Sequence, residues 1–326
     1  MSKITPFYLR TLSALHAGNG KDNGLVDLPI QRELVTGYPK IEASTLKGAL
    51  RSRVENLSKE KEYDKIHLAF GYDDQSSYKG STDFSGEGSA NAYAQYFAGA
   101  LTFTDARLLL FPIRSMWGVF AHATCLYVLR RLSEDLEQAG QGSFKKTLGS
   151  IKLEHDQCFL PDISPLEKDG KVVLEEYLFN KKPKEQGDNE GQAIAAALNT
   201  ATGLDVSRLV ILPDDAFGDF TQLFTERMTR NKIDDKTGIV ADGGLFTEEY
   251  LPAESVLYSL LIAEAPRQPK EEQGKKHKAL PSDFKTPQDV SNFLTQDCWI
   301  GADKKVLQIG GNTTVGKGIV ELTFKH

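Results

Sequence analysis

Apolar and polar residues alternate along several short stretches of the chain, and this alternation predicts β-strands. The first stretch runs from Thr5 to Ala17 and carries His16 near its end. A second stretch, residues 98–114, is broken near Asp105 and predicts one strand or a pair of strands. The remaining strand-like stretches are residues 207–212, residues 255–264 and residues 306–324, the last of which contains a glycine loop.

Apolar residues at helical spacing predict three helices. The first covers residues 44–57. Its expected core-facing residues are Leu46, Leu50, Val54 and Leu57. The second, residues 116–136, is long and largely apolar, so we expect His122 within it to be a core or interface side chain and not a ligand. The third covers residues 286–299 and is started by Pro287.

Two extended arms flank a turn from Asp234 to Gly238, which predicts a projecting β-hairpin over about residues 226–250. The arms carry basic and apolar side chains: Arg227, Met228, Arg230, Lys232 and Ile233. A hairpin this polar has little core of its own, so we expect it to lie on another surface.

Three irregular segments interrupt the predicted elements. Residues 70–96 suit a binding loop or a partly disordered excursion. Residues 140–203 form an insertion that includes a charged tract at residues 181–190, and residues 265–280 form a charged loop. Strands and helices separated by such insertions predict an α+β fold of ferredoxin-like kind, with antiparallel sheets backed by helices.

Composition limits the class of protein. The 326 residues include 40% apolar and 26% charged residues, without a bilayer-length apolar run or a signal-peptide profile, so we expect a cytoplasmic globular protein of one or two domains. Three distant cysteines without zinc-site spacing predict buried free thiols: Cys125, Cys158 and Cys298.

The net charge of −6 argues against a protein that coats nucleic acid through its overall field, so any RNA site must be local. Acidic residues concentrate in residues 214–219 and at Glu248, Glu249 and Glu254, which suggests acidic outer faces. Basic residues gather around four places: residues 47–53, Arg114, residues 130–131 and residues 227–232.

Two stretches could contact phosphate groups. The start of the helix over residues 44–57 offers free backbone N–H groups beside Lys47, Gly48 and Arg51, although an ordinary capped helix has the same pattern. The terminal loop Gly311–Lys317 matches GxxxxGK but continues with Gly318 and a strand, which excludes a nucleotide-binding P-loop. Its glycines suit either close approach to a phosphodiester or a simple glycine-rich hairpin.

Several motifs together resemble one family. They are HxGxG at residues 16–20, VDLPIQRE with Asp27, GYPKIEASTLKGALR at residues 37–51, FPIRSMWGVFAHATC at residues 111–125, and GGNTTVGKG at residues 310–318. This set, in this order over nearly the whole chain, resembles the RAMP superfamily of CRISPR proteins. More narrowly it resembles the fourth, multi-copy backbone subunit of type III-B (Cmr) effector complexes. Leu126 departs from the proline expected there.

The resemblance implies a single RAMP domain shaped like a hand. Its RRM-like, ferredoxin-like palm would comprise residues 1–57, 98–136, 205–216 and 255–326, its inserted fingers residues 70–97 and 140–203, and its thumb hairpin residues 226–250. It implies guide crRNA and target RNA as partners, further copies of the chain in a helical filament, and other Cmr subunits, with no membrane.

The resemblance also implies residue roles. Asp27 matches the catalytic aspartate, and His16 either orders its loop or donates a proton. We expect RNA contacts from the helix start, the thumb and the terminal loop: Lys47, Gly48, Arg51, Arg53, Met228, Arg230, Lys232, Gly310, Gly311, Gly316, Lys317 and Gly318.

The expected reaction is attack of a target 2'-hydroxyl on its own phosphate, after the thumb has splayed the duplex so that the attack is in line. Asp27 would accept the hydroxyl proton or hold a divalent ion, Mg or Mn, weakly. The products would be a 2',3'-cyclic phosphate and a 5'-hydroxyl. A purely structural guide-coating subunit and a guide-processing nuclease remain the alternatives.

Overall fold

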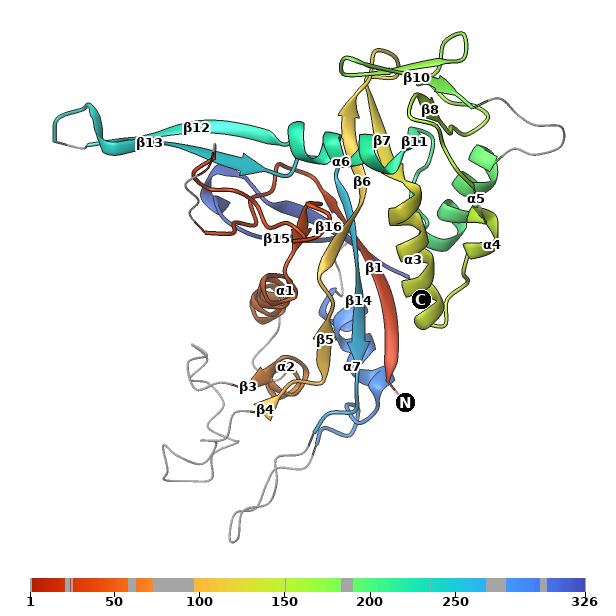
Figure 1. Cartoon of the computed structure of the whole chain (residues 1–326). Coiled ribbons are helices and arrows are strands. Elements are labelled where there is room, and N and C mark those ends of the chain that lie inside the picture. The colour runs from red at the N-terminus through yellow and green to blue at the C-terminus, as the bar shows by residue number, and fades with distance from the viewer. Residues whose placement is uncertain are drawn as a thin grey trace, which may run out of the picture.

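A twisted sheet forms the centre of the molecule (Figure 1). The computed structural model describes residues 2–20, 24, 26–57, 63–72, 97–149, 151–182, 190–234, 236–267, 280–299 and 304–325. The strands run in the order β11-β7-β6-β14-β1-β16-β15, with β2 beside β6 and β5 beside β14. Their bounds are β1 Lys3–Thr11, β2 Lys40–Ile41, β5 Leu101–Phe103, β6 Ala106–Arg114, β7 Phe120–Cys125, β11 Leu209–Leu212, β14 Val256–Ala263, β15 Lys305–Gln308 and β16 Ile319–Phe324.

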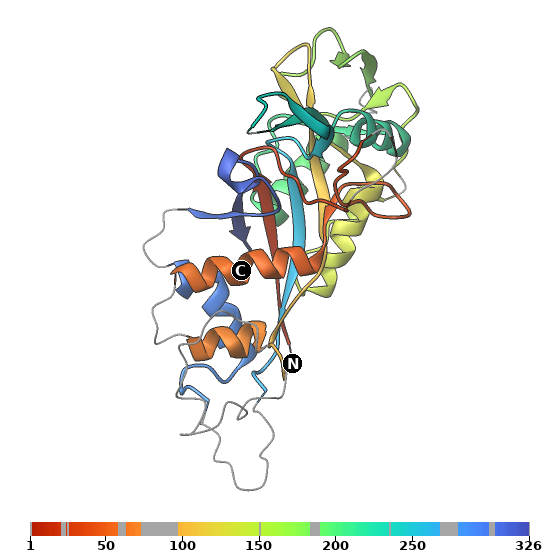
Figure 2. The same cartoon turned by 90° about the vertical axis from the view of Figure 1, so that its left-hand side faces the viewer.

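Helices cover both faces of this sheet. They are α1 Ala43–Leu57, α2 Tyr63–Phe70, α3 Leu126–Gln138, α4 Lys145–Leu148, α5 Glu190–Thr202, α6 Asp214–Leu223 and α7 Pro287–Thr295, with 3-10 turns η2 Asp297–Trp299 and η3 Thr313–Val315. α1 and α2 lie on the face seen in Figure 2, and α3 lies on the opposite face. None of the described helices is long and apolar enough to cross a membrane.

The helix over residues 44–57 is confirmed as α1, which packs on β5 and β15. Leu46, Leu50 and Val54 are fully buried, because residues four apart share one helix face. Leu57 is 40% exposed, so its assignment to the core is wrong. The predicted helix started by Pro287 is confirmed as α7, with Thr286 and Asp289 forming a capping box.

The predicted helix over residues 116–136 is wrong in its first half. Residues 120–125 form strand β7, antiparallel to β6 and parallel to β11, and only α3 from Leu126 onward is helical. A short apolar run buried between two neighbouring strands cannot be told from a buried helix by its spacing. His122 is nevertheless a satisfied side chain, since its Nε2 lies 3.0 Å from the Glu254 carbonyl oxygen.

The strand predicted to reach Ala17 ends at Thr11, where β1 leaves the sheet. The strands near residues 98–114, 207–212, 255–264 and 306–324 are confirmed, with the predicted break at Thr104 and Asp105. The expected binding loop at residues 70–96 and the charged loops at residues 181–190 and 265–280 lie largely outside the described residues. All three cysteines are buried and free, as predicted.

Three smaller sheets surround the centre. The insertion carries β8 Gln157–Cys158, β9 Lys171–Leu174 and β10 Tyr177–Lys181, and β3 Gly71–Tyr72 pairs with β4 Phe97–Ala98. The predicted hairpin is confirmed as β12 Glu226–Ile233 and β13 Val240–Tyr250. Its base pairs with the chain at Leu28, and its outer part projects beyond the sheet at the left of Figure 1.

The loop between β15 and β16 packs directly against the backbone of His16. The Gly311 N–H donates to the His16 carbonyl oxygen at 2.9 Å. A Cβ on Gly310, whose φ is +81°, would lie 2.2 Å from that oxygen. Gly318 is similar, because its Cβ would lie 2.0 Å from the Ile309 oxygen. These two glycines therefore have a structural reason to be glycine.

Replacing Gly310 by Ala should lower the free energy of unfolding by about 3 kcal/mol or more, since it adds a backbone clash to left-handed strain. Gly316→Ala is the matched control, because Gly316 has φ +74° but no atom within 4 Å of its Cβ position. That control should cost only about 1 kcal/mol. Urea unfolding measures both, and equal losses would contradict this packing.

Candidate functional site

The outer edge of β13 holds the loop that carries the predicted catalytic residues. The Leu28 N–H donates to the Thr247 oxygen and the Glu249 N–H donates to the Leu28 oxygen, each at 3.0 Å. Directly after the end of β13, Leu15 and Leu251 exchange two hydrogen bonds of 2.8 Å. β13 thus pairs with β12 on one edge and with this loop on the other, so the hairpin and the loop share a strand.

Asp27 is exposed at the start of this pairing. Its Oδ2 accepts a hydrogen bond from the Thr247 N–H at 2.7 Å. This bond gives Asp27 a structural partner on β13. Among the described residues only Thr247 donates to this carboxylate, which leaves Oδ1 available to a ligand.

His16 is half-buried and is fixed by the same strand. Its Nδ1 lies 2.7 Å from the Glu249 carbonyl oxygen, and because a carbonyl only accepts, Nδ1 carries the proton. Nε2 is then the atom with which His16 can exchange a proton. Asp27 binds the backbone of Thr247, and His16 binds the backbone of Glu249. These two residues are two positions apart on β13, which corresponds to about 7 Å along the strand.

Glu249 is the buried carboxylate that fixes the base of the hairpin. Its Oε1 accepts from Arg32 at 2.5 Å and from the Thr225 hydroxyl at 2.7 Å, and its Oε2 accepts from the Ile30 N–H at 3.0 Å. Burial by itself raises the pKa of Glu249, but Arg32 and the other donors outweigh it, so the pKa is lowered. Glu249 is therefore ionised and paired, and it does not belong to an acidic outer face.

The neighbouring Glu248 points to the other face of β13 and joins a polar cluster with Arg230, Tyr250 and Asn312. The Tyr250 hydroxyl donates to Glu248, the Arg230 Nε lies 2.5 Å from Glu248 Oε2, and the Asn312 amide donates to the Tyr250 hydroxyl at 3.0 Å. Burial raises the pKa of Glu248, and these partners lower it further than burial raises it. Glu248 is also buried, contrary to expectation.

The cluster borders His16, whose ring centroid lies 5.5 Å from that of Tyr250. The Lys317 Nζ lies 5.0 Å from the Tyr250 ring centroid, a cation–π distance. Sequence reasoning missed Glu248, Tyr250 and Asn312. Their signal was the spacing Glu-x-Tyr on a strand, since residues two apart on a strand share one face.

The basic residues of α1 divide between two faces. Lys47 is half-buried and donates to the Leu101 oxygen at 2.9 Å, and burial, together with Arg51, lowers its pKa. Arg51 pairs with Glu55 at 2.8 Å and contacts the Gly71 oxygen. These two partly buried cations are engaged within the protein, and their contact with guide RNA stays a prediction.

The opposite side of α1 forms a groove of about 550 Å³ against β15 and the terminal loop. Gly48 and Arg53 line it together with Gly310. Its other lining residues are Ser44, Thr45, Ala49, Ser52, Asn56, Leu307, Gln308 and Thr313. The buried Nε of Arg53 has no hydrogen-bond partner among the described residues, and it is the groove's only charged side chain.

The remaining predicted residues lie on the hairpin and the terminal loop. Met228 and Lys232 are exposed on β12, whereas Arg230 is held by the cluster. Both Gly311 and Gly316 lie in the terminal loop. Gly311 lies beside His16, and Gly316 lies at the surface. The described residues contain no group of three His, Cys, Asp or Glu side chains that could hold a metal ion by itself.

Comparisons with known proteins agree with this architecture. The RAMP superfamily pattern matches residues 8–321. CRISPR system Cmr endoribonuclease Cmr4 from Pyrococcus furiosus is 34% identical over 323 residues, covering 98% of this chain and 94% of that protein. The crystal structure of oligomeric Cmr4 from Pyrococcus furiosus has a TM-score of 0.64 at 28% identity, covering 100% of this chain and 98% of that one. A chain of the type III-B Cmr-beta complex bound to cognate target RNA shares the fold, with a TM-score of 0.69 at 23% identity over 98% of this chain and 96% of that one.

Replacing Glu249 by Gln should lower the free energy of unfolding at pH 7 by about 3 kcal/mol, because Arg32 loses its counter-charge in a buried place. The folded pKa of Glu249 lies below its unfolded value, so its stabilisation is complete above about pH 5 and is lost as the pH falls through the folded pKa. Chemical unfolding from pH 7 downward should show the two proteins converging. Glu264→Gln, at an exposed pair, is the control and should stay parallel to the wild type.

Proposed function

The chain belongs to the RAMP superfamily, and from this premise we propose that it is a guide-binding, target-cleaving subunit of a type III-B Cmr complex. It binds crRNA, packs against further copies of itself in a filament beside other Cmr subunits, and cuts the paired target RNA at regular intervals. One observation carries the proposal: a single strand, β13, joins the projecting hairpin to the loop with Asp27 and His16.

In this proposal the parts of the chain are those of a hand. The central sheet with α1 and α7 is the RRM-like palm, the insertion over residues 140–203 belongs to the fingers, and the hairpin over residues 226–250 is the thumb. The projection of the outer part of the hairpin supports this assignment, because strands that extend beyond the sheet are available to a duplex (Figure 1).

The guide lies in the groove between α1 and β15. Gly48 has no side chain, so a sugar or a backbone can approach this side of the helix closely. Hydroxyl and amide side chains line the rest of the groove, and Arg53 supplies a cation at its wall. Such a surface binds the backbone and reads no base, which suits a subunit that accepts any guide sequence.

Cleavage takes place beside β13. The exposed Met228 and Ile233 on the hairpin separate neighbouring base pairs, and the splayed target strand brings its 2'-hydroxyl in line with the adjacent phosphate. Asp27 accepts the hydroxyl proton as the 2'-oxygen attacks phosphorus and the bond to the 5'-oxygen breaks. The products are a 2',3'-cyclic phosphate and a 5'-hydroxyl.

His16 acts on the leaving group or orders the loop. Its Nδ1 is committed to the Glu249 carbonyl, so only Nε2 can deliver a proton to the departing 5'-oxygen. The contact with Tyr250 keeps the ring in place, and the cluster around Glu248 keeps Tyr250 in place.

A divalent ion, Mg or Mn, fits this site only partly. Oδ1 of Asp27 can provide one ligand, and phosphate oxygens and water would complete the shell, because the described residues provide no group of three such ligands. Bound in this way the ion would neutralise charge that develops on the phosphate.

A guide-coating subunit without nuclease activity is the second candidate. Asp27 caps a backbone N–H of β13, so its carboxylate already has a structural task that would explain its presence. The two candidates differ in how target RNA responds to a change at Asp27 that keeps its hydrogen bond to Thr247 but removes its basicity. The nuclease would lose cleavage, whereas the coating subunit has none to lose.

Asp27→Asn makes that distinction, because the amide oxygen can still accept the Thr247 N–H while the side chain loses its basicity and most of its metal affinity. We expect target cleavage to fall at least about 100-fold, with guide binding and assembly unchanged. Electrophoresis of labelled target RNA with the reconstituted guide complex, in magnesium or manganese, measures this. Asp27→Ala should lose cleavage and also loosen the loop, and His16→Ala should reduce cleavage less if the ring only orders the loop.

Other outcomes of that experiment point elsewhere. Cleavage by Asp27→Asn near the wild-type rate removes Asp27 from the mechanism. Guide and target binding without any cleavage by the wild type favours the coating subunit. Cutting of precursor guide RNA in the absence of target favours a guide-processing nuclease.

Gly48 provides an independent test of the groove. A side chain at this position meets no atom within 4 Å, so Gly48→Ala should stabilise the fold by about 0.5–1 kcal/mol. Gly48→Leu should fill the groove and weaken guide binding at least about tenfold while the protein stays folded. Filter binding over a range of salt concentrations measures this.

The charged residues of α1 provide the control. Arg53→Ala should flatten the log–log salt dependence by about 0.7, and Lys47→Ala should leave it unchanged because Lys47 faces Leu101. The reverse result would place the guide on the other side of α1.

A further inference from the structure

Two aliphatic side chains are presented to solvent at the tip of a turn between Arg32 and Tyr38. Leu34 is 101% exposed and Val35 is 95% exposed. No other large apolar side chain in the described part of the chain is exposed to this degree, and Ile163, at 91%, comes nearest. We call residues 33–37 the Leu34–Val35 turn.

The turn is held rigidly by its own polar atoms. The Glu33 N–H donates to the Tyr38 oxygen and the Gly37 N–H donates to the Glu33 oxygen, each at 2.9 Å. Gly37 closes the turn with φ +72°, a conformation that favours glycine. The tip therefore has a fixed backbone even though none of the described residues covers it.

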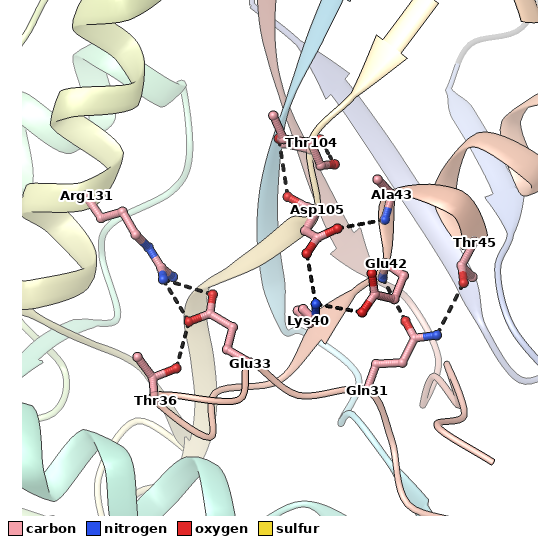
Figure 3. A network of polar contacts seen from close by, with 11 residues as sticks. Gln31, Glu33, Thr36, Lys40, Glu42, Ala43, Thr45, Thr104, Asp105 and Arg131 are labelled. Atoms are coloured by element: carbon pink, nitrogen blue, oxygen red, sulfur yellow. Dashed lines mark hydrogen bonds and ion pairs between the residues drawn. The ribbon is translucent and has the colours of Figure 1, made fainter. Parts of the chain in front are cut away.

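Side chains fix the turn to the body of the protein (Figure 3). Arg131 of α3 donates to both carboxylate oxygens of Glu33, at 2.9 and 2.8 Å, and the Thr36 hydroxyl donates to Glu33 at 2.7 Å. On the following segment, Asp105 accepts from Lys40 and from the Ala43 N–H, each at 2.9 Å. Both ends of the turn are thus anchored to separate parts of the sheet and its helices.

The turn also connects to the proposed cleavage site. Arg32 donates to the Gly37 oxygen at 2.8 Å and to Glu249 at 2.5 Å. Glu249 in turn accepts His16 at its carbonyl. Arg32 and Glu249 therefore connect the turn to the strand that holds Asp27 and His16.

A rigid tip with two uncovered aliphatic side chains suits a protein partner better than RNA. Binding of RNA phosphates needs free cations, and the two neighbouring arginines, Arg32 and Arg131, already pair with Glu249 and Glu33. A turn that is ordered before binding loses little backbone entropy when a partner covers it, so less of the free energy gained by burying the two side chains is offset.

We propose that the Leu34–Val35 turn is a contact through which a second copy of this chain packs against the first. The inference rests on the proposed filament, and a related oligomeric protein, 28% identical over all of this chain, supports a copy as the occupant. The tip meets a different surface of the next copy, because head-to-tail contacts continue into a filament whereas self-complementary contacts close into a dimer.

A single labelled cysteine tests this directly. The native thiols are all buried, and burial raises the pKa of Cys125 and of Cys158 to about 12, so they should not compete for the label. Val35→Cys carrying an environment-sensitive fluorophore should shift to the blue as protein concentration rises with guide RNA present. Ile163→Cys, equally exposed on the insertion, is the matched control and should not shift.

The second measurement is sedimentation velocity of the double variant Leu34→Ser, Val35→Ser with guide RNA. We expect association between copies to weaken at least about tenfold, with the thermal unfolding of the monomer unchanged, while Ile163→Ser behaves as the wild type. If the double variant associates as strongly as the wild type, the inference is overturned, whereas the proposed filament is not contradicted.

The two proposals fail in different ways. A wild-type protein that remains monomeric on saturating guide RNA contradicts the filament itself. A blue shift of the Val35 label at a protein concentration where only monomers sediment shows that the tip is covered by RNA or by its own chain, and it also overturns the inference.

Discussion

The backbone pairing on the outer edge of β13 is the constraint on which the site depends. An edge strand presents unpaired N–H and C=O groups, and here the loop over residues 15–28 satisfies them. The same strand provides half of the hairpin through its other edge. The position of Asp27 is therefore tied to the hairpin through the backbone of Thr247.

Electrostatics around β13 reinforce this pairing from both faces. Glu249 and Glu248 are consecutive, so strand geometry sends one toward Arg32 and the other toward Arg230. Each carboxylate would be costly to bury alone, and each is stabilised by a cation and by hydrogen-bond donors from distant parts of the sequence. This arrangement gives the hairpin base a specific orientation, which is what a site built on a loop requires from its support.

The division of α1 into two faces changes how its basic residues are understood. Lys47 and Arg51 hold the helix to β5 and to the residues after α2, whereas Gly48 and Arg53 border the groove. Two of the basic residues of α1, Lys47 and Arg51, thus contribute to packing within the protein. The groove consists mainly of neutral polar groups, glycine and one arginine, so the RNA surface proposed there is compatible with the overall charge of −6.

The sequence by itself determined the helix stripe of α1, the hairpin with its Asp234–Gly238 turn, the terminal strand–loop–strand, and the motif set that includes Asp27 and His16, because these depend on neighbours along the chain. Only the tertiary structure decided that residues 120–125 form a strand, that Gly310 faces His16, and that Glu248, Glu249 and Tyr250 support the site. Each of these depends on a partner far away in the sequence, such as β11 or Asn312. The periodicity of a sequence indicates which face of an element is apolar, but it does not indicate which distant group will pack against that face.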